Sequence, residues 1–286
     1  MDFTLQRARF RDVLRSETCV HPGSVFDAIS ARIAESLGFE IGMFAGSVAS
    51  MAILGAPDLT VITLTEFAEQ AYRICRAGRL PLLVDADHGY GNALNVMRTV
   101  EELESAGVAA LTIEDTVLPR PFGETETTLI SIEEAAAKMR AAVRARQDPG
   151  LVVVGRSQAA AFTGIEDAVT RARAYAQTGV DALFFTGVTT REALEALSAA
   201  VSLPIMLGTI NAALSDRTYL ASQNVRIALQ GHQPFSAGVQ AVYETLKALR
   251  EGVAPSDLPN VATKQLMDAV TRQDDYTTAT NDFLNA

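Results

Sequence analysis

The chain has 286 residues, of which 48% are hydrophobic and 20% charged; this is typical of a globular protein long enough for one α/β barrel. Its formal net charge of −10 argues against nucleic acid and anionic membranes as partners. No apolar run approaches the roughly 20 residues that span a bilayer, and the amino terminus lacks the apolar core of a signal peptide, so we expect a cytoplasmic protein. Cys19 and Cys75 have no spacing typical of zinc, and a reducing compartment disfavours a disulfide.

Short apolar runs alternate with longer helical patterns along the chain. An amphipathic helix is predicted at 5–15, and strands are predicted at 19–23, 41–46, 82–84, 109–115, 151–156, 182–187, 204–209 and 226–231. Helices are predicted at 26–37, 65–77, 95–106, 132–146, 165–178, 190–201, 215–223 and 235–250. Strands that are apolar throughout are typical of a parallel sheet covered on both faces. Eight strand–helix units predict a closed (β/α)8 barrel, of the triosephosphate isomerase type, rather than an open doubly wound sheet.

The chain is expected to divide into a barrel and an extension. Residues 1–252 form the predicted catalytic barrel, and residues 253–286 form a linker followed by a helical, acidic tail from 261. A tail that cannot bury itself on a finished barrel often packs on a neighbouring subunit, so we predict oligomerisation. The segment 116–129 is irregular, contains three Pro or Gly residues, and is long enough to act as a lid.

The most informative stretch is LPLLVDADHGYGN at 80–92, where an apolar run stops at Asp85 and Asp87. If 82–84 is a buried strand, both carboxylates point to the same face, because side chains alternate with period two. Two carboxylates held that close repel each other, and a metal cation relieves the repulsion. Oxygen ligands favour Mg²⁺ or Mn²⁺ over zinc. The alternative is that one Asp caps the next helix and the other is solvated.

A barrel brings the carboxyl ends of its strands to one face, where catalytic groups gather. The polar residues at those positions are Ser47, Asp85, Asp87, His88, Glu114, Asp115, Arg156 and His232. Glu114 is well placed as a further carboxylate near the metal, unless it and Asp115 only cap the following loop. Arg156 ends an apolar run, where an unpaired guanidinium would be costly. It therefore pairs with a protein carboxylate or binds an anionic ligand, and the acidic chain favours the ligand.

The histidines and Asp58 are less clearly assigned. His232 ends the eighth strand, where it could hydrogen-bond a carboxylate or carbonyl group of a substrate. His88 could orient Asp85 or Asp87. His21 lies inside the first predicted strand and is interpreted as a core histidine. Asp58 follows Pro57 and is either an ordinary turn residue or a base or metal-water anchor that reaches over the site.

These motifs resemble those of the isocitrate lyase and phosphoenolpyruvate mutase superfamily. Residues 84–92 resemble its DxDxGYGN signature, and AGSVAS (45–50), IED (113–115) and VGRSQA (154–159) lie where the superfamily has its glycine-serine, IED and ART motifs. The resemblance covers residues 5–250. It implies a (β/α)8 barrel, Mg²⁺, 2-oxo acid chemistry through an enolate, and a homotetramer (a dimer of dimers) whose subunits exchange C-terminal helices.

Within the superfamily, the chain is most similar to the oxaloacetate decarboxylase branch. That similarity implies Mg²⁺-dependent conversion of oxaloacetate, a small 2-oxo dicarboxylate, to pyruvate and CO₂. It implies roles for Ser47 as the branch's serine, Asp85 as its magnesium ligand, Arg156 as its substrate arginine and His232 as its characteristic histidine. Together with the positions argued above, we expect three kinds of site residue. The expected metal residues are Asp85, Asp87 and Glu114; the expected substrate-binding residues are Gly46, Ser47, Arg156 and His232; and the expected catalytic residues are His232, Arg156 and Asp58.

The predicted lid departs from two other branches. C–C bond lyases carry a Cys-Gly-His motif whose cysteine supplies a proton, whereas this chain has PFGE at 121–124. Phosphonate enzymes carry Lys with Asn or Thr, for which Arg120 is an imperfect substitute. The ART motif is also altered, with Gly155, Ser157 and Gln158. A lyase of the 2-methylisocitrate or dimethylmalate type, a phosphonopyruvate-cleaving enzyme, and a non-catalytic barrel that binds metal and 2-oxo acid remain alternatives. So does a decarboxylase of another dicarboxylate, with Gln158 and Ile210 reshaping the pocket.

Overall fold

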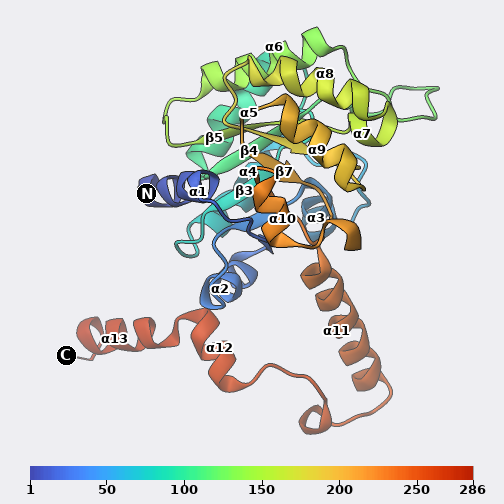
Figure 1. Cartoon of the computed structure of the whole chain (residues 1–286). Helices are drawn as coiled ribbons and strands as arrows, with labels where there is room; N and C mark the ends of the chain where they lie inside the picture. Colours follow the sequence, from blue (N-terminus) through green and yellow to red (C-terminus); the bar gives the residue numbers. More distant parts are fainter. Residues whose placement is uncertain (286) are drawn as a thin grey trace. The chain divides into compact units, whose positions relative to one another are not determined.

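Eight parallel strands form one sheet in which each strand pairs with the next along the chain (Figure 1). We describe a computed structural model that covers residues 1–285. The strands are β1 (Gly23–Ser24), β2 (Gly42–Phe44), β3 (Leu82–Asp85), β4 (Ala110–Glu114), β5 (Val152–Ser157), β6 (Ala182–Phe185), β7 (Ile205–Leu207) and β8 (Val225–Ala228). Seven of the predicted strand regions are therefore found, in the predicted order, and the first overlaps β1 only at Gly23.

The segment before β1 closes the sheet into a barrel. The backbone N–H of Val20 donates to Arg226 O at 2.9 Å, and the Val20 carbonyl accepts from Ala228 N at 3.0 Å. Val20 thus pairs with β8 on the side of that strand that does not face β7. The (β/α)8 barrel predicted from the eight strand–helix units is confirmed.

The first strand is shorter than predicted. The expected strand covered 19–23, but β1 contains only Gly23 and Ser24. Pro22 offers no backbone N–H to a strand ladder, so it separates the bridge at Val20 from β1. The intervening His21 is partly buried, with Nδ1 2.7 Å from Ala228 O. This agrees with its interpretation as a satisfied structural histidine.

Helices follow the strands and cover the outside of the sheet (Figure 1). Up to β8 they are α1 (Thr4–Arg15), α2 (Ala28–Ser36), α3 (Gly46–Ala49), the π-helix η1 (Ser50–Leu54), α4 (Leu64–Cys75), α5 (Ala93–Ser105), α6 (Ile132–Ala145), α7 (Ala159–Phe162), α8 (Ile165–Ala176), α9 (Arg191–Ala200), the 3₁₀ turn η2 (Ala212–Leu214) and α10 (Arg217–Ser222). Local sequence explains several starts. Thr63 and Asn92, for example, cap the first turns of α4 and α5 with their side chains.

The strands are buried on both faces, as their continuous apolar sequences predict. All five residues of β4 and the first three of β3 are buried. Large side chains that are fully buried, including Phe44, Leu83 and Leu111, fill the interior. Such packing leaves the polar ends of the strands as the place where chemistry can occur.

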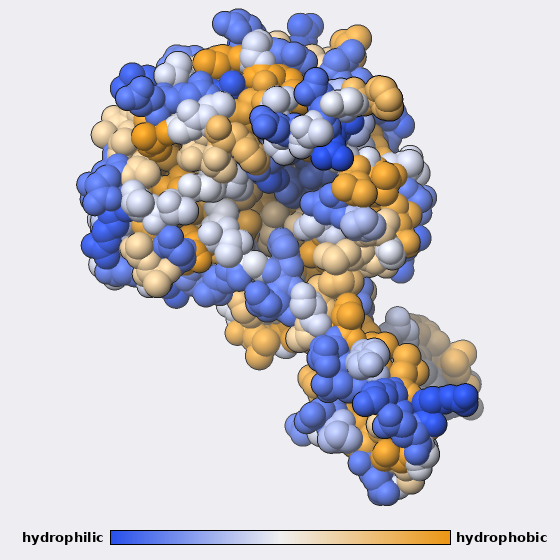
Figure 2. Space-filling model, turned by 90° about the vertical axis from the view of Figure 1, so that its right-hand side faces the viewer, coloured by the Kyte–Doolittle hydropathy of each residue, from blue (hydrophilic) through white to orange (hydrophobic). Residues whose placement is uncertain are grey.

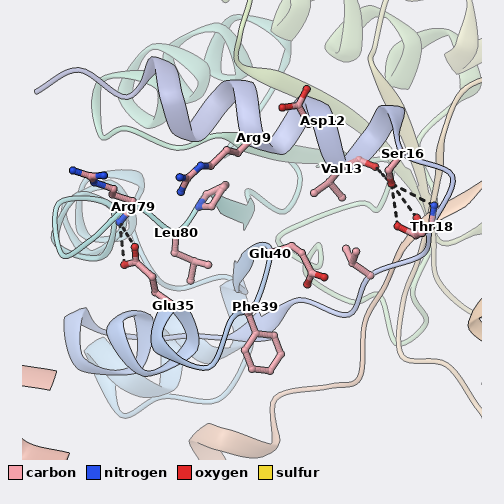
Figure 3. A pocket seen from close by; sticks show the side chains of 12 residues that line it. Arg9, Asp12, Val13, Ser16, Thr18, Glu35, Phe39, Glu40, Arg79 and Leu80 are labelled. Carbon is pink, nitrogen blue, oxygen red and sulfur yellow. Dashed lines mark hydrogen bonds between the residues drawn. The ribbon is translucent and has the colours of Figure 1, made fainter. Parts of the chain in front are cut away.

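Helix α1 lies at the amino-terminal end of the barrel, where two buried or half-buried arginines hold it. Arg7 donates to Val108 O, and Arg11 donates to the carbonyls of Gly150 and Leu151. On the other side of α1, a hollow of about 460 Å³ lies between that helix and the segments that precede β2 and β3 (Figure 3). None of the predicted site residues lines this hollow, so it is distinct from the expected site.

The described chain forms two compact units, residues 1–231 and 232–286, which we call the barrel unit and the tail unit. The tail unit contains α11 (Gln233–Arg250), η3 (Pro255–Asp257), α12 (Lys264–Thr271) and α13 (Gln273–Phe283). Helical structure is thus present in the predicted tail, whose last residue, Ala286, lies outside the described residues. The domain boundary expected at 252/253 stays a prediction. In the part of the chain that the structure describes, no helix is both long and apolar enough to cross a membrane.

Candidate active site

The carboxyl ends of neighbouring strands bring polar side chains from distant parts of the sequence to one face of the barrel unit. Asp85 is in register with Thr112, and Glu114 with Arg156. Helices α3 and α7 follow β2 and β5 and lie on the right-hand side of Figure 1. Figure 2 shows that side of the molecule face-on, and a hollow with hydrophilic residues opens on it. Strand alternation and register therefore place Asp85, Glu114 and Arg156 on the adjacent strands β3, β4 and β5.

Arg156 joins two of the predicted metal-site carboxylates. Its Nη1 forms an ion pair and hydrogen bond with Asp85 Oδ2, and its Nε lies 3.1 Å from Glu114 Oε2 in an ion pair whose angle is poor for a hydrogen bond. The guanidinium carbon lies 5.3 Å from the centre of the Phe184 ring. Of the two interpretations of Arg156, pairing with protein carboxylates is the one observed. Nη2 makes no hydrogen bond with residues 1–285. The binding of an anionic ligand by Arg156 stays a prediction.

Asp85 is also fixed by a residue that sequence reasoning missed. Thr112 Oγ1 donates to Asp85 Oδ1 at 2.8 Å, and the backbone N–H of Asp87 contacts the same oxygen at 3.3 Å. Thr112 precedes Glu114 by two residues on β4, so period-two alternation places both on the same face. The two-residue spacing from Glu114 is the sequence signal that could have identified Thr112 as a site residue. The contact orients one carboxylate oxygen and leaves the other with Arg156.

Asp87 lies in a strained turn against α3. Its φ of +46° is in the left-handed region, as is that of Tyr90 at +60°, and such conformations in residues other than glycine cluster at functional sites. A Cβ at Gly46 would lie 2.7 Å from Asp87 Oδ1 and 2.9 Å from Oδ2. Only glycine leaves room for this carboxylate, which explains why the first residue of α3 lacks a side chain.

Gly46→Ala should therefore disturb the site directly. We expect turnover to fall by at least about tenfold and the protein to lose about 1–3 kcal/mol of stability, because the added methyl overlaps Asp87. Steady-state rates and thermal unfolding measure the two effects. Gly238→Ala, in α11, is the matched control: no atom lies within 4 Å of its Cβ position, so turnover should be unchanged. Wild-type turnover in Gly46→Ala would contradict this arrangement.

Glu114 is almost completely buried, at 2% exposure, and accepts a hydrogen bond from a side-chain amide. Gln158 Nε2 lies 2.9 Å from Glu114 Oε2 and 2.9 Å from Thr116 Oγ1. Glu114 N in turn donates to Asp87 O at 2.9 Å, which connects β4 to the turn after β3. Glu114 thus belongs to the cluster and is not a simple cap of the loop that follows.

Asp115 has a different role from Glu114. Its side chain is fully buried and accepts hydrogen bonds from Ser157 Oγ at 2.7 Å, Tyr175 OH at 2.7 Å and Arg171 Nη1 at 3.1 Å. Arg171 and Tyr175 belong to α8, so Asp115 connects β4 to the helix layer. Asp115 therefore fixes the end of β5, at Ser157, to the helix α8 that covers the outside of the sheet.

The site is rich in negative charge. Burial first, and then Asp85 and Glu114, raise the pKa of Asp87 well above its usual value. Burial also raises the pKa of Glu114, although Arg156 opposes the shift. For Arg156, burial would lower the pKa, but Asp85 and Glu114 outweigh it and the net shift is upward. One guanidinium thus faces three carboxyl groups, and it cannot balance all three if they are ionised; the raised pKa values of Asp87 and Glu114 reflect this repulsion and their burial.

The predicted residue Asp58 is exposed but electrostatically linked to this cluster. Partial desolvation, and then the charge of Asp85, raise the pKa of the Asp58 carboxyl. His88 is buried, and its Nδ1 has no hydrogen-bond partner within residues 1–285. Burial, followed by the nearby charge of Lys138, lowers the pKa of His88 to about 4. His88 is therefore neutral at pH 7, and the suggestion that it orients Asp85 or Asp87 stays a prediction.

The remaining predicted residues are Ser47 and His232. Ser47 is partly exposed in the first turn of α3, beside Gly46. His232 is the first residue of the tail unit and precedes α11. The barrel unit therefore brings together Gly46, Asp85, Asp87, Glu114 and Arg156, while the predicted contact of His232 with a substrate stays a prediction.

The donor set fits a hard divalent cation. Carboxylate oxygens are the ligands that Mg²⁺ and Mn²⁺ prefer, and the surplus of buried negative charge calls for a cation. Within residues 1–285 no three acidic, His or Cys side chains form a ready-made cage. Arg156 lies between Asp85 and Glu114, which keeps them apart. Mg²⁺ usually keeps several waters and needs only one or two direct carboxylates, so Asp85 could bind directly and Asp87 and Glu114 through water.

A closed (β/α)8 barrel with acidic residues and an arginine at the carboxyl ends of its strands defines a barrel enzyme that is suited to a small anionic substrate and a divalent metal. Residues 10–250 match the family model described as phosphoenolpyruvate phosphomutase. The match covers most of the chain. The protein belongs to this family.

Individual relatives agree with that assignment. An oxaloacetate decarboxylase from Bradyrhizobium diazoefficiens is 59% identical over 273 residues, which cover 96% of this chain and 95% of the relative. The crystal structure of phosphoenolpyruvate phosphomutase from Streptomyces platensis subsp. rosaceus is 26% identical, with a TM-score of 0.86 and coverage of 97% and 99% of the two chains. Phosphonopyruvate hydrolase in complex with oxalate and Mg²⁺ is 26% identical, with a TM-score of 0.84 and coverage of 98% and 99%.

Proposed function

We propose that this protein decarboxylates oxaloacetate to pyruvate and CO₂ with Mg²⁺ as its cofactor, a role that Mn²⁺ can also fill. The observation that carries the proposal is the cluster of Asp85, Glu114 and Arg156 at the carboxyl ends of β3, β4 and β5. The near-full-length similarity to a relative named oxaloacetate decarboxylase supports the choice of substrate. The phosphonopyruvate hydrolase complex, which contains Mg²⁺ and oxalate, supports a metal-dependent site for small acids in this fold.

The chemistry requires stabilisation of a developing negative charge. When the bond between C3 and C4 of oxaloacetate breaks, C4 leaves as CO₂. The electrons of that bond form a double bond between C2 and C3, and the negative charge moves to the C2 oxygen, which gives an enolate. A bound Mg²⁺ would supply Lewis-acid stabilisation of that oxygen. Asp85, with Asp87 and Glu114 in support, would hold the ion. A proton added at C3 then completes pyruvate.

The other residues bind and orient the substrate. Arg156 Nη2 is available for the C1 carboxylate, while Nη1 and Nε keep their contacts with Asp85 and Glu114. The backbone and hydroxyl at Gly46 and Ser47 would bind the same end. We assign His232 to the region of the C2 oxygen or to protonation of the enolate, and Asp58 to a base or to an anchor for metal-bound water.

A metal-replacement assay tests the proposal. The protein is treated with EDTA, dialysed and assayed for pyruvate formation from oxaloacetate, with and without added Mg²⁺. We expect activity to vanish after EDTA and to return with Mg²⁺ or Mn²⁺. Because free metal also promotes this reaction, the reference is oxaloacetate with Mg²⁺ and no protein. A rate no higher than that reference would favour the non-catalytic alternative, a barrel that binds metal and 2-oxo acid.

Oligomerisation is part of the proposal. Helix α11 buries no residue, and its apolar side chains Val239, Val242, Tyr243 and Leu246 are each more than half exposed. Their spacing of three and four residues forms one stripe along the helix. A stripe of this kind favours a subunit contact, which supports a homotetramer, a dimer of dimers, in which we propose that residues 253–286 pack on a neighbouring subunit.

The tetramer is tested by mass. Light scattering of the purified protein should give four times the 30.5 kDa of one chain. The double variant Val242→Glu and Leu246→Glu should give a smaller species, because it adds charge to the apolar stripe. Gln240→Glu, on the same helix but in a polar position, is the matched control. A monomeric wild-type protein would contradict this part of the proposal. The cytoplasmic location expected from the sequence stays a prediction.

A further inference from the structure

One side-chain amide contacts the carboxylate cluster and has no role in the steps described above. Gln158 follows β5 and immediately precedes α7. Its Nε2 donates to Glu114 Oε2 and to Thr116 Oγ1, both at 2.9 Å, so the two amide hydrogens connect the end of β4 to the start of the irregular segment 116–129. Gln158 is partly exposed, unlike Glu114, which it contacts.

The backbone around Gln158 is fixed by hydrogen bonds to the buried side chain of Asp115. Gln158 N lies 3.3 Å from Asp115 Oδ1, and the preceding residue, Ser157, donates to Asp115 Oδ2 at 2.7 Å. Asp115 is itself held by Arg171 and Tyr175 of α8. Because this turn is fixed, the side chain of Gln158 starts from a well-defined position. A residue that orients another side chain needs such a position.

The chemical type of residue 158 also fits the charge of its surroundings. Glu114 Oε2 contacts Arg156 Nε at 3.1 Å and Gln158 Nε2 at 2.9 Å, so both neighbours of this oxygen are donors. A carboxylate at 158 would face Glu114 with a like charge and would add to the surplus already present. The neutral amide donates to Glu114 without changing the net charge of the cluster.

We infer that Gln158 is a positioning residue that, by hydrogen bonding through its amide, holds Glu114 in the orientation in which Glu114 supports the divalent cation. This inference rests on the proposed metal-dependent function. Gln158 acts through Glu114 and touches neither the metal nor the reacting atoms. Its removal should therefore weaken metal binding and slow turnover while the binding of oxaloacetate to the metal-loaded protein changes little.

The test compares Mn²⁺ binding, measured by electron paramagnetic resonance of free Mn²⁺, with steady-state kinetics at saturating Mn²⁺. Gln158→Met keeps the size of the side chain but removes both donors. We expect the Mn²⁺ dissociation constant to rise about tenfold, kcat to fall about tenfold, and KM for oxaloacetate to stay within about twofold. Gln177→Met, the same change at an exposed position at the end of α8, is the matched control and should leave all three values unchanged.

Gln158→Glu separates position from charge and serves as the second variant if Gln158→Met does not fold. An added carboxylate should keep Mn²⁺ affinity at or above the wild-type level, yet kcat should still fall about tenfold because Glu114 loses the amide donor at position 158 and keeps only its other neighbours. Wild-type Mn²⁺ affinity and kcat in Gln158→Met, or wild-type kcat in Gln158→Glu, would overturn the inference alone. Wild-type protein that bound no Mn²⁺ would instead overturn the proposed function and the inference with it.

Discussion

Arg156→Ala should reduce turnover of oxaloacetate by about two to three decades. The variant removes the only cation observed in contact with Asp85 and Glu114 within the described residues, together with the donor assigned to the substrate carboxylate. A well-placed donor of this kind typically contributes a few kcal/mol to transition-state stabilisation, which corresponds to the stated loss. Steady-state kinetics with Mg²⁺ measure it. Metal binding should not weaken, because the carboxylates lose a competing positive charge.

The structure offers a matched control for this variant. Arg146 forms an ion pair with Asp181 in which both side chains are 16% exposed, close to the 14% and 12% of Arg156 and Asp85. That pair lies outside the candidate site, because Arg146 immediately follows α6 and Asp181 immediately precedes β6. Arg146→Ala should therefore lower the unfolding temperature and leave turnover unchanged. Equal losses of turnover in the two variants would show that Arg156 matters only for folding.

Asp85→Asn should have the largest effect on metal dependence. The amide keeps the size of the side chain and an oxygen that can accept from Thr112, but it loses the charge that would bind the cation directly. We expect Mg²⁺ affinity to weaken by at least about two decades and turnover to fall by about three, since a metal ion contributes several kcal/mol to a step of this kind. Calorimetry with Mg²⁺ and steady-state kinetics measure the two effects.

Asp181→Asn is the control for Asp85→Asn, since it makes the same change in an ion pair of similar burial. It should alter stability but neither metal binding nor turnover. If Asp85→Asn bound Mg²⁺ as tightly as the wild type, another group would have to be the principal anchor. Asp87 and Glu114 would then be the first candidates.

Much of the fold could be predicted because each strand has its own signal. Runs such as 151–156 and 182–187 are apolar throughout, and glycine ends several of the helices that separate them, so strand number and order follow from local pattern. The position of β1 did not follow. Val20, inside the predicted strand, forms only an isolated bridge, with Ile227 more than 200 residues away, and Pro22 has no N–H to donate, so pairing with β2 begins at Gly23. Local sequence reports neither.

The candidate site was predicted where side chains alternate along a strand. Asp85, Glu114 and Arg156 could be placed on one face because barrel strands end together, and the structure brings them into contact. The partners that hold them were less accessible. Thr112 has an ordinary strand sequence around it, and the contact of Gln158 with Glu114 depends on a rotamer and on a turn after β5 that only the folded chain defines.

The direct test of the account is a comparison of kcat/KM for three substrates with the Mg²⁺-loaded protein. Pyruvate and CO₂ are measured from oxaloacetate, and cleavage is measured with 2-methylisocitrate and with phosphonopyruvate. We predict that oxaloacetate is the preferred substrate by at least about two decades, that EDTA abolishes the reaction, and that Arg156→Ala loses it. A higher kcat/KM for either of the other two substrates would contradict the account.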